Sequence, residues 1–446
     1  MQENHNRLYG TVYGMEVGMS DRVHIGNRMK NVFVVGASGT GKSYNYVLSN
    51  LLTESHSAVV LDSSDMLYKE CGDYLRSRGH KVWYFSIINH AFNEEFCCHF
   101  DPFKHIENKK TLVNIICGFL LDDKSKSEGG DPFYTKLEND TFRHIVEYVV
   151  YSDKLKDEER NLVTVMNIVN ELASVLPSSD YRNEKSLLSK YKIMYTNKGL
   201  KCYHNAMCGL KIKLAPFMYK SVLKSFIETP DTDNINIEAL GSKQSYLFIG
   251  GIADTIFEDA ELSALDRLLG LLTYSIGVAV QTYAEQCLKN NTMLHCSHFL
   301  PHPLHYYLDD FKFYNFPILS LIFTDRRCGV SCSYITNDID SLEKLYGEDW
   351  LTFYHACDTF ICTGTMLHKD AEFISNSCGR LYSSANSRDL YIPQVQYDTE
   401  EYQNSKPIVT PDDVLRLSEE GKWLVSVRDI YPVICDKPDP NNYRKD

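Results

Sequence analysis

The sequence contains no long apolar run, no export signal and no paired-cysteine motif. No uninterrupted apolar stretch is long enough to cross a bilayer, and the first five residues, Met1 to His5, do not begin a signal segment. The fourteen cysteines include no CxxC pair, which is typical of reduced thiols rather than of a disulfide framework. We therefore expect a soluble cytoplasmic protein, with no transmembrane segment in this chain.

Charge and length set wider limits. The formal net charge of −13 opposes indiscriminate nucleic-acid binding, although a local basic patch can exist on an acidic protein. The 446 residues exceed the size at which one hydrophobic core usually stops growing. Two domains, or one domain with a large insertion, are therefore expected.

A glycine-rich loop at residues 36–43 fits the phosphate-binding (Walker A) pattern. An apolar β-branched run at 31–35 precedes it, and a segment that can form a helix, 44–52, follows it. In this context backbone N–H groups turn toward a triphosphate, Lys42 reaches its β and γ phosphates, and Ser43 ligates magnesium. ATP or GTP with Mg²⁺ is the expected cofactor. The expected binding residues are Gly36, Ser38, Gly39, Thr40, Gly41, Lys42 and Ser43.

The order of strand and helix signals predicts an α/β sheet that an all-α insertion interrupts. Amphipathic helical runs are expected at residues 132–151, 161–175 and 260–288. We expect a nucleotide-binding domain whose first part is 1–118 and whose second part is 236–446, with the insertion domain at 119–235. The expected strands are 31–35, 57–61, 81–87, 245–249, 304–308, 330–335, 358–363 and 422–427.

Two adjacent acids end the expected strand at 304–308. Hydrolysis of a nucleotide needs a carboxylate that orients magnesium and a neighbouring group that polarises water. We expect Asp309 to hold the magnesium shell through Ser43, and Asp310 to face the attacking water. The alternative is a helix or turn start with two surface acids.

Taken together, these segments resemble the type IV secretion coupling proteins, the ring ATPases of the TraG/TraD kind in conjugative DNA transfer. The resemblance follows nearly the whole chain in order, and no piece beyond the loop is specific alone. It rests on residues 31–43, Val59–Asp62, Phe100–Phe103, Asp131–Phe133, Asp309–Phe311, Leu342–Gly347 and Trp423–Val427.

The resemblance implies a RecA-like P-loop nucleotide-binding domain interrupted by an all-α insertion domain. It also implies a homo-hexamer at the cytoplasmic face of the cell membrane, with ATP between subunits and an arginine finger from a neighbour. Arg326 or Arg327 matches the position of that arginine, although a solvated basic pair is the alternative. Asn337 falls where the family senses the γ phosphate, so Asp310, Arg326 and Asn337 are the implied catalytic residues.

Three departures from the family pattern point to weaker hydrolysis. Asp310 replaces the usual glutamate and Asn337 the usual glutamine, each one methylene shorter. Ser63–Met66 stands in place of Pro-Lys-Gly-Glu. Because a displacement of about 1 Å can reduce a rate about a hundredfold, either the active site has contracted in concert or the protein hydrolyses slowly or not at all.

A basic, tyrosine-bearing stretch lies within the expected insertion, at residues 182–224. Its ten cations meet one acid, Glu184, and four tyrosines are interleaved with them. Cations for phosphates and rings for bases are the mixture that binds single-stranded DNA, but a solvated helix face with inward-packed tyrosines is the alternative. The expected contacts for DNA or relaxosome proteins are Lys190, Lys192, Lys198, Lys201, Lys211 and Lys213.

A histidine-rich segment precedes Asp309 but fits no closed zinc spacing. Pro301 and Pro303 within it indicate an extended connector, so no metal site is predicted there. The potential ligands are His295, Cys296, His298, His302 and His305.

The sequence favours a coupling ATPase that delivers a DNA–protein (relaxosome) substrate to the components of a conjugative type IV secretion channel. The first alternative is a hydrolysis-poor, ATP-binding adaptor that presents protein substrates to the channel. A third reading is a DNA-pumping translocase of the chromosome-segregating type, which would need a DNA-orienting module that the sequence does not display.

Overall fold

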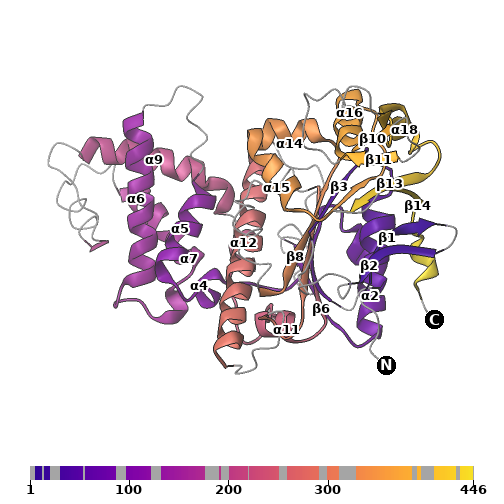
Figure 1. Ribbon diagram of the computed structural model, residues 1–446. Coiled ribbons are helices and arrows are strands. Elements are labelled where there is room, and N and C mark those ends of the chain that lie inside the picture. Colours follow the sequence, from indigo (N-terminus) through magenta and orange to yellow (C-terminus); the bar gives the residue numbers. More distant parts are fainter. Residues whose placement is uncertain are drawn as a thin grey trace.

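A large mixed sheet and a separate group of helices make up the computed structural model (Figure 1). In the described parts of the chain, no helix is both long and apolar enough to cross a membrane. The structure describes residues 6–12, 15–20, 31–53, 56–86, 97–121, 132–175, 190–191, 200–218, 220–250, 259–290, 299–310, 328–383, 389–392, 406–427 and 432–444.

Seven parallel strands, in the order β9-β3-β8-β7-β4-β6-β5, form one side of the eleven-stranded sheet and end at its edge strand β5. Strands covered on both faces are continuously apolar, which is why the sequence predicted them well. Their bounds are β3 Val32–Val35, β4 Ser57–Asp62, β5 Lys81–Ser86, β6 Ser245–Gly250, β7 Leu304–Asp309, β8 Val330–Thr336 and β9 Thr359–Cys362.

Antiparallel strands extend the sheet beyond β9 in the order β13-β14-β1-β2. The bounds of these four strands are β1 Asn6–Val12, β2 Met15–Ser20, β13 Lys422–Val427 and β14 Val433–Asp436. A second, three-stranded sheet contains β10 Arg380–Ser383, β11 Asp389–Ile392 and β12 Lys406–Pro407. The sequence analysis predicted β13 but not the other six.

Helices cover both faces of the central sheet. Successive side chains of a strand point to opposite faces, and accordingly Val32 and Val34 join one buried apolar cluster while Phe33 and Val35 join the other. The first cluster includes η1 Lys42–Leu48, α1 Ser49–Thr53 and α2 Met66–Ser77. Packed in the second are α11 Ile237–Ser242, α12 Asp259–Asn290, α14 Ile339–Tyr346, α15 Trp350–Ala356, α16 His368–Ser377 and α18 Pro411–Arg416.

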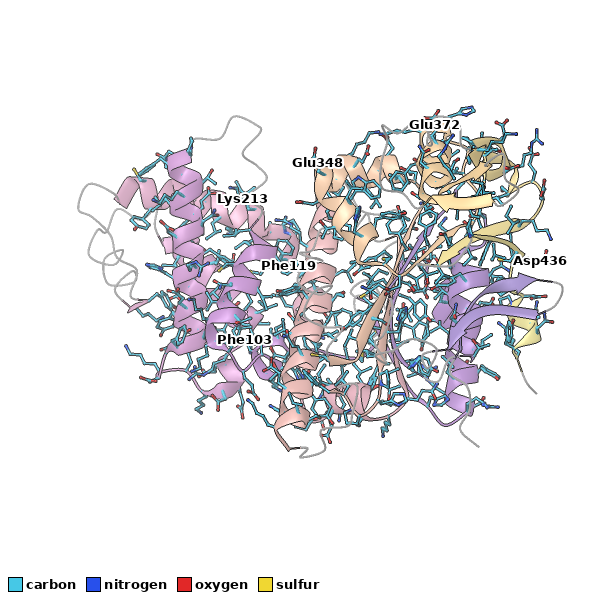
Figure 2. The ribbon with its side chains drawn as sticks, viewed as in Figure 1. Phe103, Phe119, Lys213, Glu348, Glu372 and Asp436 are labelled. Carbon is cyan, nitrogen blue, oxygen red and sulfur yellow. The ribbon has the colours of Figure 1, made fainter. Side chains whose placement is uncertain are left out.

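The helical group lies beside α12, on the side away from the sheet (Figure 1). Phe119 of α5 contacts Tyr274 of α12, with ring centroids 5.8 Å apart (Figure 2). Arg267 of α12 donates to the Leu120 carbonyl at 3.3 Å. The group consists of α4 Pro102–His105, α5 Lys109–Leu120, α6 Pro132–Tyr151, α7 Leu162–Val175, α9 Leu200–Leu214 and α10 Lys220–Ser225.

Two neighbouring segments connect the helical group to the sheet. The outgoing chain pairs with the sheet edge, where the Cys98 N–H donates to the Tyr84 carbonyl at 2.8 Å. The returning chain pairs with the outgoing one, because His99 donates to Asp233 at 2.8 Å and Ile235 donates to His99 at 3.0 Å. The two connections therefore lie side by side.

Four short 3-10 turns complete the described helical structure. They are η4 Asp157–Glu159, η5 Ala215–Phe217, η8 Gly347–Asp349 and η9 Pro440–Asn442.

Candidate nucleotide-binding site

The glycine-rich loop joins the end of β3 to η1. Gly39 and Gly41 have φ of 79° and 97°, a region that glycine enters at little steric cost. Ser38 and Gly39 are exposed at the tip of the loop, whereas Lys42 is only 6% exposed. The Lys42 ammonium donates to the carbonyls of Gly36 at 2.7 Å and Ala37 at 3.0 Å, so it lies within the loop.

A wide helical turn follows the loop. The Gly41 carbonyl accepts from the N–H groups of Asn45 at 2.8 Å and Tyr46 at 3.2 Å, which is the pattern of a π-helix. The helical chain continues directly into α1. Its N-terminal N–H groups and the positive end of its dipole lie at the loop, as in phosphate-binding sites.

The Ser43 hydroxyl donates a short hydrogen bond to the carboxylate of Asp309. Asp309 ends β7, which only β8 separates from β3. Burial, aided by the charges of Asp310 and Asp62 and opposed by the Ser43 hydrogen bond and Lys42, raises the pKa of Asp309 to about 7. A hydroxyl and a buried carboxylate are oxygen donors of the kind that Mg²⁺ takes, and a bound cation would stabilise the ionised carboxylate that burial disfavours. These residues therefore fit magnesium.

Asp310 and Asn337 meet at the ends of the adjacent strands β7 and β8. The Asn337 amide donates to the Asp310 carboxylate at 3.0 Å. Asp310 has a φ of 52°, an uncommon backbone conformation for a residue other than glycine. The structure thus brings together two of the three residues expected to be catalytic. The third, Arg326, lies outside the described residues, as does Arg327.

Two family models match the chain. The model for "Type IV secretory system Conjugative DNA transfer" matches residues 2–205, and the model for the "TraM recognition site of TraD and TraG" matches residues 303–419. The chain belongs to the type IV secretion coupling proteins. Comparison with curated proteins gives no significant match.

Solved structures show the same fold at low sequence identity. The coupling protein aligns with TrwB in complex with ADP and Mg²⁺ at a TM-score of 0.62 and 11% identity, over 98% of this chain and 95% of TrwB. The trigonal form of TrwB in complex with sulphate aligns at a TM-score of 0.60 and 12% identity, over 91% of this chain and 85% of TrwB. VirB4 of Thermoanaerobacter pseudethanolicus aligns at a TM-score of 0.55 and 11% identity, over 100% of this chain and 99% of VirB4. The RecA-like α/β fold that the family resemblance implied is therefore confirmed.

The structure adds residues that the sequence analysis did not place at the site. Asp62, at the end of β4, is 2% exposed, and burial raises its pKa to about 6. Its carboxylate accepts from the Tyr68 N–H at 2.8 Å, at the start of α2. Thr363 and Gly364, which follow β9, contact the glycine-rich loop. The sequence predicted the strands before these residues, but not which strands are neighbours.

The basic stretch of the coupling protein is only partly described. Lys190 pairs with Glu171 at 3.2 Å, and the Tyr191 hydroxyl donates to the same carboxylate from a side chain that is 5% exposed. Lys213 pairs with Glu138 on α6 (Figure 2). Tyr191 thus packs inward, as the alternative interpretation expected. Of the remaining expected contacts, Lys211 is exposed, the side chain of Lys201 is not described, and Lys192 and Lys198 lie outside the described residues.

His305, from the histidine-rich segment, is fully buried in β7. Its Nδ1 lies 2.5 Å from the Ser331 hydroxyl and its Nε2 lies 2.8 Å from the Ser333 hydroxyl, both on β8. The His305 side chain therefore links β7 to β8 through both of its ring nitrogens. His295, Cys296 and His298 lie outside the described residues, and the part of the chain that is described has no group of three or more side chains suited to a metal ion.

Proposed function

We propose that this coupling protein binds ATP with Mg²⁺ and hydrolyses it to deliver a DNA–protein substrate to a conjugative type IV secretion channel. The observation that carries the proposal is the hydrogen bond between Ser43 of the loop and Asp309 of β7. It joins the two halves of a magnesium–nucleotide site from positions 266 residues apart. TrwB structures in complex with ADPNP and with ADP and Mg²⁺ support the choice of ligand.

In this proposal the loop N–H groups bind the phosphates, and Lys42 leaves the loop carbonyls to contact the β and γ oxygens. Ser43 and Asp309 hold magnesium, which when bound supplies positive charge to the phosphate oxygens. Asp310 orients the attacking water and takes up its proton, while Asn337 contacts the γ phosphate. Arg326 of a neighbouring subunit in a homo-hexamer stabilises the transferring phosphoryl group.

The contact between Asp310 and Asn337 supports concerted contraction of the active site. Each side chain is one methylene shorter than its usual family counterpart, yet the amide and the carboxylate lie 3.0 Å apart. The contact therefore favours a working ATPase over the hydrolysis-poor adaptor.

The proposal also covers the organisation and the partners of the chain. A nucleotide-binding domain, expected from the sequence at 1–118 and 236–446, carries an all-α insertion domain expected at 119–235; α4 and α5, which precede residue 121, pack with the insertion helices. The description of the model that matches 303–419 supports a relaxosome protein as one partner. The exposed Lys211 remains a candidate contact for single-stranded DNA, and the hexamer is placed at the cytoplasmic face of the membrane.

The ion pairs of Lys190 and Lys213 favour the second candidate, a protein-presenting adaptor, because they leave less free positive charge for DNA. DNA-stimulated hydrolysis separates the two functions.

The decisive experiment is steady-state ATP hydrolysis with and without single-stranded DNA. We expect DNA-stimulated turnover in the wild type and a loss of at least about a hundredfold in Lys42→Ala, since removing a single transition-state contact can cost that much. Lys69→Ala, at an exposed lysine of α2, is the matched control. Asp310→Glu should be slower, because the longer side chain collides with Asn337. Tight ATP binding without turnover under any condition would leave the adaptor.

A further inference from the structure

The chain after β9 runs beside the glycine-rich loop and continues the pairing of β9 with β3. The Thr363 N–H donates to the Val35 carbonyl at 2.9 Å, and the Ala37 N–H donates to the Gly364 carbonyl at 2.7 Å. The first residues of the loop are therefore held as an extension of the sheet. Gly364 has a φ of 116°, which turns the chain away at this point.

A hydroxyl pair locks the other end of the loop to the same segment. The Thr40 hydroxyl donates to the Ala37 carbonyl at 2.7 Å, and the Thr363 hydroxyl lies 2.6 Å from the Thr40 oxygen. The Thr40 hydroxyl has a close carbonyl acceptor in Ala37, whereas the nearest carbonyl to the Thr363 hydroxyl, that of Val35, lies at 3.4 Å, so we assign Thr363 as the donor in this pair. Thr40 is 4% exposed and Thr363 is fully buried, so water has no access to replace the bond.

Thr363 also fixes how closely the loop approaches β9. A Cβ atom at Gly36 would lie 1.9 Å from the Thr363 hydroxyl oxygen and 3.0 Å from that of Thr40. The first glycine of the motif is thus required by the Thr363 side chain, and not by a left-handed backbone. The Thr363 hydroxyl therefore lies against Gly36 at the start of the loop and against Thr40 near its end.

We propose that Thr363 is a positioning residue for nucleotide binding, which holds the glycine-rich loop in its phosphate-binding shape without touching the nucleotide. The inference rests on the proposed function. Without the hydroxyl, the loop occupies its competent shape for a smaller fraction of the time, and the apparent affinity falls by that fraction. One lost buried hydrogen bond corresponds to about a fivefold weaker affinity.

The test is isothermal titration calorimetry of Mg²⁺ with a non-hydrolysable ATP analogue. Thr363→Val keeps the shape and removes the hydroxyl, and should bind about fivefold more weakly. Thr363→Ser keeps the hydroxyl and should bind like the wild type. Thr359→Val is the matched control, since it makes the same change at a buried position at the other end of β9 and should leave affinity unchanged.

A purely structural role of Thr363 would lower the unfolding temperature of Thr363→Val without nucleotide and leave the affinity of the folded variant unchanged. The inference predicts instead that the two valine variants unfold at similar temperatures and differ in affinity. Should Thr363→Val fail to fold, Thr363→Ala takes its place in the same comparison. Wild-type affinity in Thr363→Val overturns the inference alone, whereas a wild-type protein that binds no nucleotide overturns the proposed function and the inference together.

Discussion

Replacing Asp309 by asparagine should stabilise the protein at neutral pH and remove its magnesium site. Burial raises the pKa of Asp309 to about 7 from an ordinary value of 3.8, so the folded state holds this proton more tightly than the unfolded state. The contribution of Asp309 to the free energy of unfolding is therefore largest at low pH and falls as the pH rises from about 4 to about 7. Asparagine has the same shape, can still accept from the Ser43 hydroxyl, and carries no charge.

The size of the effect follows from the proton affinity. Each tenfold change in proton affinity corresponds to about 1.4 kcal/mol. Ionised Asp309 therefore lowers the free energy of unfolding at pH 8 by at most about 4 kcal/mol. Asp309→Asn should raise the unfolding temperature by several degrees, at about 2–4 °C per kcal/mol for a large domain. Conversely, ATP with Mg²⁺ at a hundred times its dissociation constant should stabilise the wild type by about 2.7 kcal/mol and the variant by little.

Thermal unfolding at pH 8 and pH 5, with and without ATP and Mg²⁺, measures both effects. The advantage of Asp309→Asn over the wild type should shrink as the pH falls from 8 to 5. Asp231→Asn, at an exposed acid, is the control and should not change the unfolding temperature at either pH. If Asp309→Asn unfolds below the wild type at pH 8 without nucleotide, the electrostatic reasoning is wrong.

Three further predictions concern stability, measured by equilibrium unfolding in urea. Gly364→Ala should lower the free energy of unfolding by about 2–3 kcal/mol, because the φ of 116° is strained for alanine and its Cβ would lie 2.8 Å from that of Ser418. An unchanged free energy of unfolding would contradict this. Gly118→Ala, where a Cβ meets nothing within 4 Å in α5, should instead gain about 0.5–1 kcal/mol, and a loss would count against the helix. Glu228→Ala should lose about 2–4 kcal/mol, because His105 and the Asp101 N–H lose a buried acceptor; a loss under about 1 kcal/mol would refute that contact.

The central strands could be predicted because burial on both faces leaves a continuous apolar run. The expected strand at 304–308 is β7, and the expected helix at 132–151 coincides with α6 Pro132–Tyr151. The hairpin of β1 and β2 gave no such signal. β2 alternates Met15, Val17 and Met19 with Glu16, Gly18 and Ser20, but the alternation is short, and a glycine inside each strand lowers its β propensity.

The candidate site was predictable where its chemistry is local in the sequence. The glycine-rich loop and the two acids after β7 are recognisable from their own residues and flanks. The contacts of Thr363 depend on β9 lying beside β3, an arrangement that neither strand encodes alone. Similarly, the inward packing of Tyr191 depends on Glu171, which lies 20 residues earlier, on α7.

The paired connections between the sheet and the helical group constrain how the two can move. A single linker would leave the helical group free to rotate, whereas two hydrogen-bonded segments lying side by side, together with the packing of α5 on α12, restrict its rotation relative to the sheet. Glu228, on the returning side, links the two connections through its contacts with Asp101 and His105. A displacement at the strand ends would therefore move the helical group together with the two connections and α12, and not independently of them.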